Sequence, residues 1–184
     1  MNVVIRHLAA GLVTFLFVAL GATHLNGQTA KPDAPAFNVV SLDGQPFDLI
    51  SLRGKVVVLD FWVTGCAPCV EELPKLNSLV DEFKNKDVVF IAPTWDKEPL
   101  LRTFLKEYPF KFHIIPDAKD LVLEACSDGA GSVIVPTRLV IDKNGKVELK
   151  TTGGFLTEGE GPKRFDELRN AIVRLVNASS AKPN

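Results

Sequence analysis

The sequence predicts an α/β sandwich with a mixed central sheet, on the basis of three observations. Residues 56–62 (VVVLDFW) form a continuous apolar, β-branched run, which is typical of a central strand covered on both faces. Strand-like and helix-like segments alternate along the chain after this run. Asn144-Gly145 separates two strand-like runs, and this dipeptide is a strong signal for an antiparallel hairpin.

The individual elements follow from hydrophobic periodicity and from turn residues. Asp43-Gly44 lies between two short β-like runs and predicts a hairpin ahead of the central strand. Residues 70–83 and 163–176 place apolar side chains at helical spacing. In chain order, strands are expected at residues 37–42, 47–50, 56–62, 88–93, 112–115, 138–141 and 146–149, and helices at residues 70–83, 99–107, 121–125 and 163–176.

The first 30 residues have the composition of a targeting segment. Arg6 is their only formally charged residue, and residues 8–22 (LAAGLVTFLFVALGA) form an apolar run shorter than the ~20 residues that span a bilayer comfortably. We expect residues 1–30 to be a signal peptide or an N-terminal membrane anchor plus linker, with a buried helix of the fold as a third alternative. The protein is therefore expected to be extracytoplasmic, either periplasmic or secreted, and a membrane tether through residues 8–22 stays open.

Composition excludes several classes of protein. The chain has 21 basic and 22 acidic residues, so its formal charge of -1 offers no broad cationic surface for nucleic acid. A hydrophobic content of 46% is too high for a disordered chain, and 3 cysteines are too few for a disulfide-stapled scaffold. Residues 31–178 are therefore expected to form one globular domain, followed by a disordered tail at residues 179–184.

The chemistry is expected where the central strand leads into its helix. Cys66-Ala67-Pro68-Cys69 begins shortly after Trp62, so both sulfurs lie beyond the carboxyl end of a strand and at the start of a helix. The partial positive charge of a helix N-terminus stabilises a thiolate and lowers the pKa of a cysteine, which makes Cys66 the expected nucleophile. Cys69, one helical turn later, can attack the mixed disulfide that Cys66 forms with a substrate.

Two other interpretations of the cysteine pair compete with redox chemistry. A structural zinc site needs four ligands, and the rest of the domain supplies only Cys126 and His113. Two buried, inert thiols at such a corner, behind a signal segment, would be a coincidence. Redox chemistry is favoured, and neither a metal nor a cofactor is expected.

Asp60 is the second candidate for the site. Its position inside an apolar strand predicts that desolvation raises the pKa of its carboxyl, which makes it a candidate proton acceptor for Cys69. An unpaired buried carboxyl is costly unless it is used in chemistry or hydrogen-bonded.

Residues 59–69 (LDFWVTGCAPC) resemble the active-site strand and helix start of the thioredoxin superfamily. Residues 33–37 (DAPAF), 52–56 (LRGKV), 135–137 (VPT) and 141–147 (IDKNGKV) narrow the resemblance to the extracytoplasmic TlpA/ResA-type thiol:disulfide oxidoreductases. The similarity extends over residues 33–176. It implies a thioredoxin-like three-layer sandwich with a mixed central sheet and an extra N-terminal β-hairpin.

The resemblance also implies roles for individual residues. Pro136 matches the cis-proline of the family, with a trans proline in an ordinary turn as the alternative. Val135, Pro136 and Trp62 are the candidate substrate-binding residues. Pro74 matches the proline that kinks the active-site helix. Glu72 matches a glutamate characteristic of ResA-like proteins and is a candidate catalytic residue, the alternative being an exposed acid favoured by the helix dipole.

The implied partners are extracytoplasmic disulfide-containing proteins and a membrane or periplasmic thiol reductant. Gly65 departs from the family, which usually has a bulky aromatic residue there, so the identity of the partner protein does not follow from the resemblance. Cys126 is expected to be a small buried side chain. The alternatives to an oxidoreductase are a thiol peroxidase, whose motif is not matched, and a non-catalytic binding or metal-carrier module on the same fold.

Overall fold

A five-stranded mixed sheet forms around the predicted central strand. The computed structural model describes residues 30–156 and 158–178. The strand order is β5-β4-β3-β6-β7, in which β3 pairs parallel with β4 and antiparallel with β6. The five strands are β3 (Val56–Phe61), β4 (Val88–Pro93), β5 (His113–Ile115), β6 (Thr137–Ile141) and β7 (Val147–Thr152). All six residues of β3 are buried, as expected for a strand covered on both faces.

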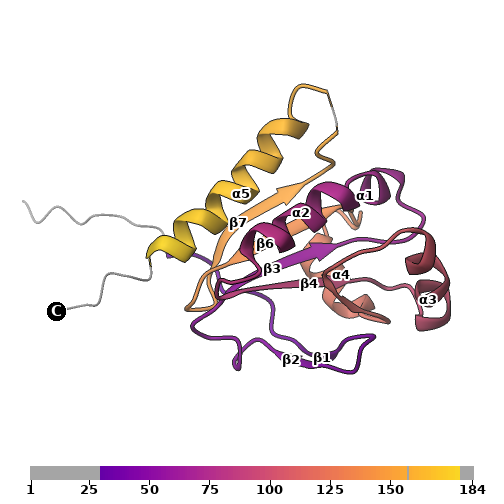
Figure 1. Ribbon diagram of the computed structural model, residues 1–184, viewed down its shortest axis with the longest axis horizontal. Helices are drawn as coiled ribbons and strands as arrows, with labels where there is room; N and C mark the ends of the chain where they lie inside the picture. The colour runs from indigo at the N-terminus through magenta and orange to yellow at the C-terminus, as the bar shows by residue number, and fades with distance from the viewer. Residues whose placement is uncertain (1–29, 157, 179–184) are drawn as a thin grey trace, which may run out of the picture. The chain divides into compact units, whose positions relative to one another are not determined.

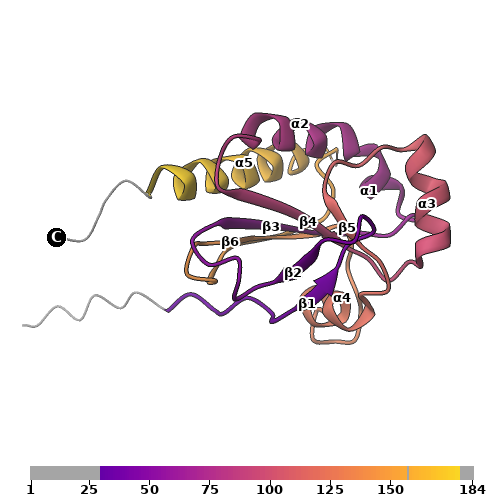
Figure 2. The ribbon, with the colours of Figure 1, turned by 60° about the horizontal axis from the view of Figure 1, so that its bottom comes forward.

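Helices and a hairpin cover the two faces of this sheet (Figures 1 and 2). Figure 2 shows α2 (Leu73–Phe83) and α5 (Gly161–Asn177) on one face, and α4 (Lys119–Cys126) with β1 (Asn38–Val40) and β2 (Pro46–Asp48) on the other. The remaining helix of the sandwich, α3 (Glu98–Glu107), contributes Leu101 to the core on the α2 and α5 side. The predicted three-layer thioredoxin-like sandwich and its N-terminal hairpin are confirmed.

The alternation of side chains along β3 divides the core in two. Val56, Val58 and Trp62 join the hydrophobic cluster beneath α2 and α5, whereas Val57 and Leu59 join the cluster beneath α4 and the hairpin. Asp60 lies two residues after Val58, so the two side chains point to the same face of the sheet. The buried carboxyl of β3 therefore lies on the α2 and α5 side of the sheet.

The helix predicted at residues 70–83 is interrupted. A short helix, α1 (Ala67–Glu71), ends at Glu72, and α2 begins immediately afterwards with Pro74 in its first turn. Proline has no backbone N–H and clashes with the preceding turn, so a continuous helix is broken at this point. The predicted kink is therefore present, and the break lies at Glu72.

The remaining predicted elements are present with shifts of a few residues at their ends. The predicted signal peptide or anchor at residues 1–30 falls almost wholly outside the described residues, as does the predicted tail at residues 179–184. Within residues 30–156 and 158–178, no helix is both long and apolar enough to cross a membrane.

Candidate active site

The two cysteines of the C-x-x-C motif are joined at the start of α1. Cys66 and Cys69 form a disulfide, with their Cα atoms 5.3 Å apart. Cys66 is the N-cap residue of the helix, and its Sγ accepts the backbone N–H of Cys69 at 3.2 Å. Cys66 is partly exposed, whereas Cys69 is only 1% exposed. Cys66 is therefore the sulfur that an incoming protein reaches first.

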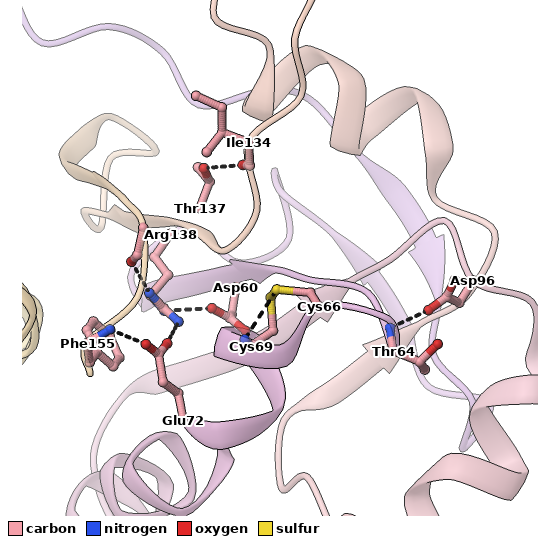
Figure 3. The surroundings of a disulfide bond; sticks show 11 residues. Asp60, Thr64, Cys66, Cys69, Glu72, Asp96, Ile134, Thr137, Arg138 and Phe155 are labelled. Atoms are coloured by element: carbon pink, nitrogen blue, oxygen red, sulfur yellow. Dashed lines mark hydrogen bonds and ion pairs between the residues drawn. A yellow bond between two sulfur atoms is a disulfide. The ribbon is translucent and has the colours of Figure 1, made fainter. Parts of the chain in front are cut away.

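The loop in front of Cys66 is tied to the end of β4. The Thr64 backbone N–H donates to Asp96 Oδ2 at 2.6 Å (Figure 3), and the Asp96 N–H donates to Thr94 Oγ1 at 3.1 Å. This carboxylate holds the turn that presents the outer sulfur. Asp96 was not singled out from the sequence, because nothing in its local pattern relates it to a loop 32 residues earlier.

The loop before β6 has the conformation that the resemblance implies. The Val135–Pro136 peptide bond is cis, so the trans alternative for Pro136 is wrong. Thr137 Oγ1 donates to the carbonyl of Ile134 at 2.7 Å, and the Ile134 N–H donates to the carbonyl of Cys126 at 3.1 Å. Both Val135 and Cys66 pack against the cluster beneath α2 and α5.

Three charged side chains are buried together next to the disulfide (Figure 3). Asp60, Glu72 and Arg138 are 1%, 0% and 0% exposed, respectively. Arg138 Nη2 donates to Glu72 Oε2, and its Nε lies 2.7 Å from Asp60 Oδ1. The second contact is an ion pair without an aligned hydrogen bond, because neither atom has a partner that meets hydrogen-bond geometry.

Two further contacts fix this cluster to the loop after β7. The Phe155 N–H donates to Glu72 Oε1, and Arg138 Nη1 donates to the carbonyl of Gly153 at 3.3 Å. The Arg138 guanidinium also lies 3.8 Å above the centre of the Phe155 ring. The cluster therefore joins β3, the α1–α2 break, β6 and the loop that leads to α5.

The environment shifts the acidity of Asp60 in the predicted direction. Burial raises the pKa of the Asp60 carboxyl to about 6, the nearby Arg138 cation lowers it, and the Glu72 anion raises it. Because desolvation dominates, the carboxyl has a pKa close to neutrality and can exchange a proton there.

Two expectations about individual side chains are corrected by their burial. Glu72 is not an exposed acid stabilised by the helix dipole, because the break after α1 turns its carboxylate into the protein. Trp62 is 0% exposed and packs against Phe104 and Phe110, with ring centroids 5.5 Å apart in both pairs. Its indole belongs to the core and offers no surface to a substrate.

Arg138 is the main residue that the sequence analysis missed. The available signal was its place in a strand-like run, two residues before Val140, where an apolar side chain is expected. A charged residue at such a position needs a buried partner of opposite charge.

The third cysteine lies apart from this chemistry. Cys126 is a free thiol that is 3% exposed, and burial raises its pKa to about 11. It is the small buried side chain that was expected. Among residues 30–156 and 158–178, no group of three or more His, Cys, Asp or Glu side chains is placed to hold a metal ion.

A cysteine pair at a strand-to-helix corner, with a partly exposed nucleophile and a buried partner, on a thioredoxin-like sandwich, defines a thiol–disulfide oxidoreductase. The comparisons with known proteins agree. The Redoxin family model matches residues 28–170, and the chain belongs to this family.

The similar proteins carry matching names. Thiol-disulfide oxidoreductase ResA from a strain of Bacillus cereus is 37% identical over 154 residues, covering 83% of this chain and 86% of the relative. ResA from Bacillus subtilis (strain 168) is 31% identical over 156 residues, covering 80% and 84%. The crystal structure of a putative thiol:disulfide interchange protein DsbE from Chlorobium tepidum superposes with a TM-score of 0.66 at 28% identity, covering 79% and 96%.

Proposed function

We propose that this oxidoreductase acts as a reductant of disulfides in extracytoplasmic proteins, with Cys66 as nucleophile and Cys69 as resolving cysteine. The observation that carries the proposal is the asymmetry of the pair. Cys66 is partly exposed at a helix N-terminus, whereas Cys69 is enclosed and lies beside a buried carboxyl cluster. A reductant needs one accessible thiol that ionises and attacks the substrate, and a second, buried thiol that resolves the mixed disulfide.

The first step forms a mixed disulfide. The Cys66 thiolate attacks one sulfur of the substrate disulfide, a Cys66–substrate S–S bond forms, and the other substrate sulfur leaves as a thiolate. The helix N-terminus favours the thiolate of Cys66 by supplying partial positive charge, and the Cys69 N–H donates to its Sγ.

The second step releases the reduced substrate. The Cys69 thiol loses its proton to the carboxyl cluster and attacks Cys66 Sγ, which forms the Cys66–Cys69 disulfide and expels the second substrate thiolate. Asp60 and Glu72 are the proposed proton-handling residues. The substrate leaves with two electrons, and a dithiol reductant at the membrane or in the periplasm must return them.

The substrate is proposed to approach over the loop before β6. Ile134 is 41% exposed and Val135 partly exposed, so the chain that precedes Pro136 is accessible, and Val135 packs against the same core cluster as Cys66. Gly65 adds no side chain to this surface, and a Cβ placed on it meets nothing within 4 Å. The site therefore leaves room for an extended protein segment next to Cys66.

The compartment is part of the proposal. The apolar run at residues 8–22 behind Arg6 supports export, with the segment either removed as a signal peptide or kept as a membrane anchor. An oxidising compartment also gives a disulfide reductant its substrates.

Reduction of insulin by dithiothreitol, followed by turbidity, tests catalysis. The wild-type protein is expected to accelerate precipitation, Cys66→Ala to abolish the acceleration, and Cys69→Ala to accumulate a mixed disulfide visible on a non-reducing gel. Cys126→Ala is the matched control, because this buried thiol lies outside the site, and it should behave as wild type. Equal acceleration by Cys66→Ala would exclude the proposed nucleophile.

The direction of electron flow is tested by equilibrating the cysteine pair with glutathione. A reductant should have a potential nearer to the approximately −270 mV of thioredoxin than to the approximately −120 mV of a strong oxidant such as DsbA. A potential near that of DsbA would indicate that the protein is an oxidase and not a reductase, and the roles of Cys66 and Cys69 in disulfide exchange would stand.

A further inference from the structure

We propose that Arg138 is a positioning residue that joins Asp60 and Glu72 into one buried group, in which Glu72 remains a carboxylate and Asp60 carries the exchangeable proton. This inference deepens the proposed function and rests on it, since the proton comes from the resolving thiol of Cys69. It removes the ambiguity between the two acids, because their surroundings differ.

The two carboxyl groups are held in unequal ways. Both oxygens of Glu72 are engaged as acceptors, one by Arg138 Nη2 and the other by the Phe155 N–H. A proton on either oxygen of Glu72 would displace one of these donors and break a buried hydrogen bond. Asp60 Oδ1 meets only the edge of the guanidinium at 2.7 Å and accepts no aligned hydrogen bond. Asp60 is thus the carboxyl with an oxygen that can bind the proton.

The net charge of the cluster also favours the binding of one proton to one of its two carboxylates. Two carboxylates and one guanidinium carry a net charge of -1 in a volume with almost no exposure. An isolated buried charge is costly, so a proton on one acid relieves the cluster. Without the cation, two adjacent buried carboxylates would repel each other, and at least one would hold its proton to a much higher pH.

No other described charge offsets that of Asp60. On α5, Arg164 directs Nη1 to the carbonyl of Gly154 at 3.2 Å, and on α2, Lys75 lies over the Phe165 ring, 5.5 Å from its centre. On the α4 side, the facing titratable group is the thiol of Cys126. The charges that act on Asp60 are those of Arg138 and Glu72.

This arrangement makes the proton transfer neutral for the protein interior. Before the transfer, the Cys69 thiol is uncharged and the cluster carries -1. Afterwards, the Cys69 thiolate carries -1 and the cluster, with Asp60 protonated, carries none. The buried charge moves without increasing, so the interior meets no additional desolvation cost. Arg138 makes this possible because it keeps Asp60 ionised, and hence able to accept, near neutral pH.

The reaction of the reduced full-length protein with 5,5′-dithiobis(2-nitrobenzoate) separates the two steps. Cys66 attacks the reagent and releases one thionitrobenzoate at a rate proportional to reagent concentration. Cys69 then attacks the mixed disulfide and releases a second thionitrobenzoate at a rate independent of it. The first phase reports the nucleophile of the proposed function, and the second reports the proton transfer proposed here.

The variants Arg138→Met, Arg138→Lys and Asp60→Asn are compared with Arg164→Met between pH 5 and 9. In wild type, the second phase should accelerate with a midpoint near the Asp60 pKa of about 6. Arg138→Met should raise that midpoint by at least one pH unit, which slows the second phase about fivefold or more at pH 6, while its first phase stays within about twofold of wild type. Arg138→Lys keeps the positive charge, so its midpoint should stay close to that of wild type. Asp60→Asn should remove the pH dependence of the second phase near pH 6. Arg164→Met, a matched loss of an arginine from the adjoining loop contact, should leave it unchanged.

Carbon-13 NMR of the aspartate carboxyls in the oxidised protein gives a readout that needs no turnover. One resonance should titrate near pH 6, disappear in Asp60→Asn and move to higher pH in Arg138→Met. An unshifted resonance, or a second phase whose pH dependence is the same in all four variants, would overturn the role of Arg138 while the first phase still supports the oxidoreductase. If Arg138→Met does not fold, Glu72→Gln decides by the same two measurements. It should lower the midpoint, because the Glu72 anion raises the pKa of Asp60, and an unchanged midpoint would overturn the proposal.

Discussion

The pH dependence of folding stability provides a direct test of the buried carboxyl on β3. The pKa of Asp60 rises from 3.8 to about 6 on folding, which corresponds to about 3 kcal/mol at 1.36 kcal/mol per unit. Because the folded-state pKa is the higher one, the folded protein binds more protons than the unfolded chain between these values. The stabilising contribution of protonated Asp60 is complete below pH 4 and is lost as the pH rises through 6.

The change Asp60→Asn removes this titration and keeps the shape of the side chain. Wild type loses about 2 kcal/mol of this roughly 3 kcal/mol of stability between pH 4.5 and 8. The rest is already lost below pH 4.5, where the titration begins. The variant, relative to wild type, should therefore become more stable by about 2 kcal/mol over this range. The ion pair with Arg138 is already contained in the pKa of Asp60, and the difference between the amide and the protonated carboxyl adds an offset that is the same at both pH values.

The measurement is guanidinium unfolding of the oxidised proteins, followed by tryptophan fluorescence at pH 4.5, 6 and 8. The matched control is Asp87→Asn, at an exposed acid in the turn before β4, whose stability should differ from wild type by the same amount at each pH. If Asp60→Asn gave a difference from wild type that varied by less than about 0.5 kcal/mol between pH 4.5 and 8, Asp60 would not be the titrating group.

Three further outcomes follow from single contacts. In the reduced protein, Cys126 should react with thiol reagents only after unfolding, because burial raises its pKa to about 11; two fast thiols per chain are expected in a native titration and three in denaturant. Gly161→Ala should lower the free energy of unfolding by about 1–3 kcal/mol, since its Cβ would lie 2.2 Å from the carbonyl oxygen of Phe155; an unchanged denaturation midpoint would show that the loop relaxes. Asp96→Ala should cost about 1–3 kcal/mol by leaving the Thr64 N–H without its acceptor, which thermal unfolding can measure.

The order of the elements was determined by the sequence itself, because each depends on local patterns. Two-residue and 3.6-residue periodicity distinguish strands from helices wherever one face is buried. Asn144-Gly145 indicated the hairpin that joins β6 to β7, and the C-x-x-C motif identified the start of α1. Pro74 likewise indicated a break, because the absence of its N–H is a property of the residue alone.

The surroundings of each active-site side chain depended on the tertiary structure. Glu72 could not be distinguished from a surface acid, because the break after α1 changes the direction in which its side chain points. Trp62 was a candidate substrate-binding residue, although its position directly after β3 places it beneath α3. Periodicity shows which side chains of a strand share a face of the sheet. It does not show which elements pack against that face.

Arg138 is the clearest example of that limit. Asp60 and Arg138 are directly opposite each other because β3 and β6 pair antiparallel in one particular register, and the partners come from distant parts of the chain. A shift of one residue in that pairing would turn Arg138 to the other face of the sheet. The sequence thus determined which chemical groups are present and on which elements they lie, whereas only the packing of the strands brought the cation between the two acids beside Cys69.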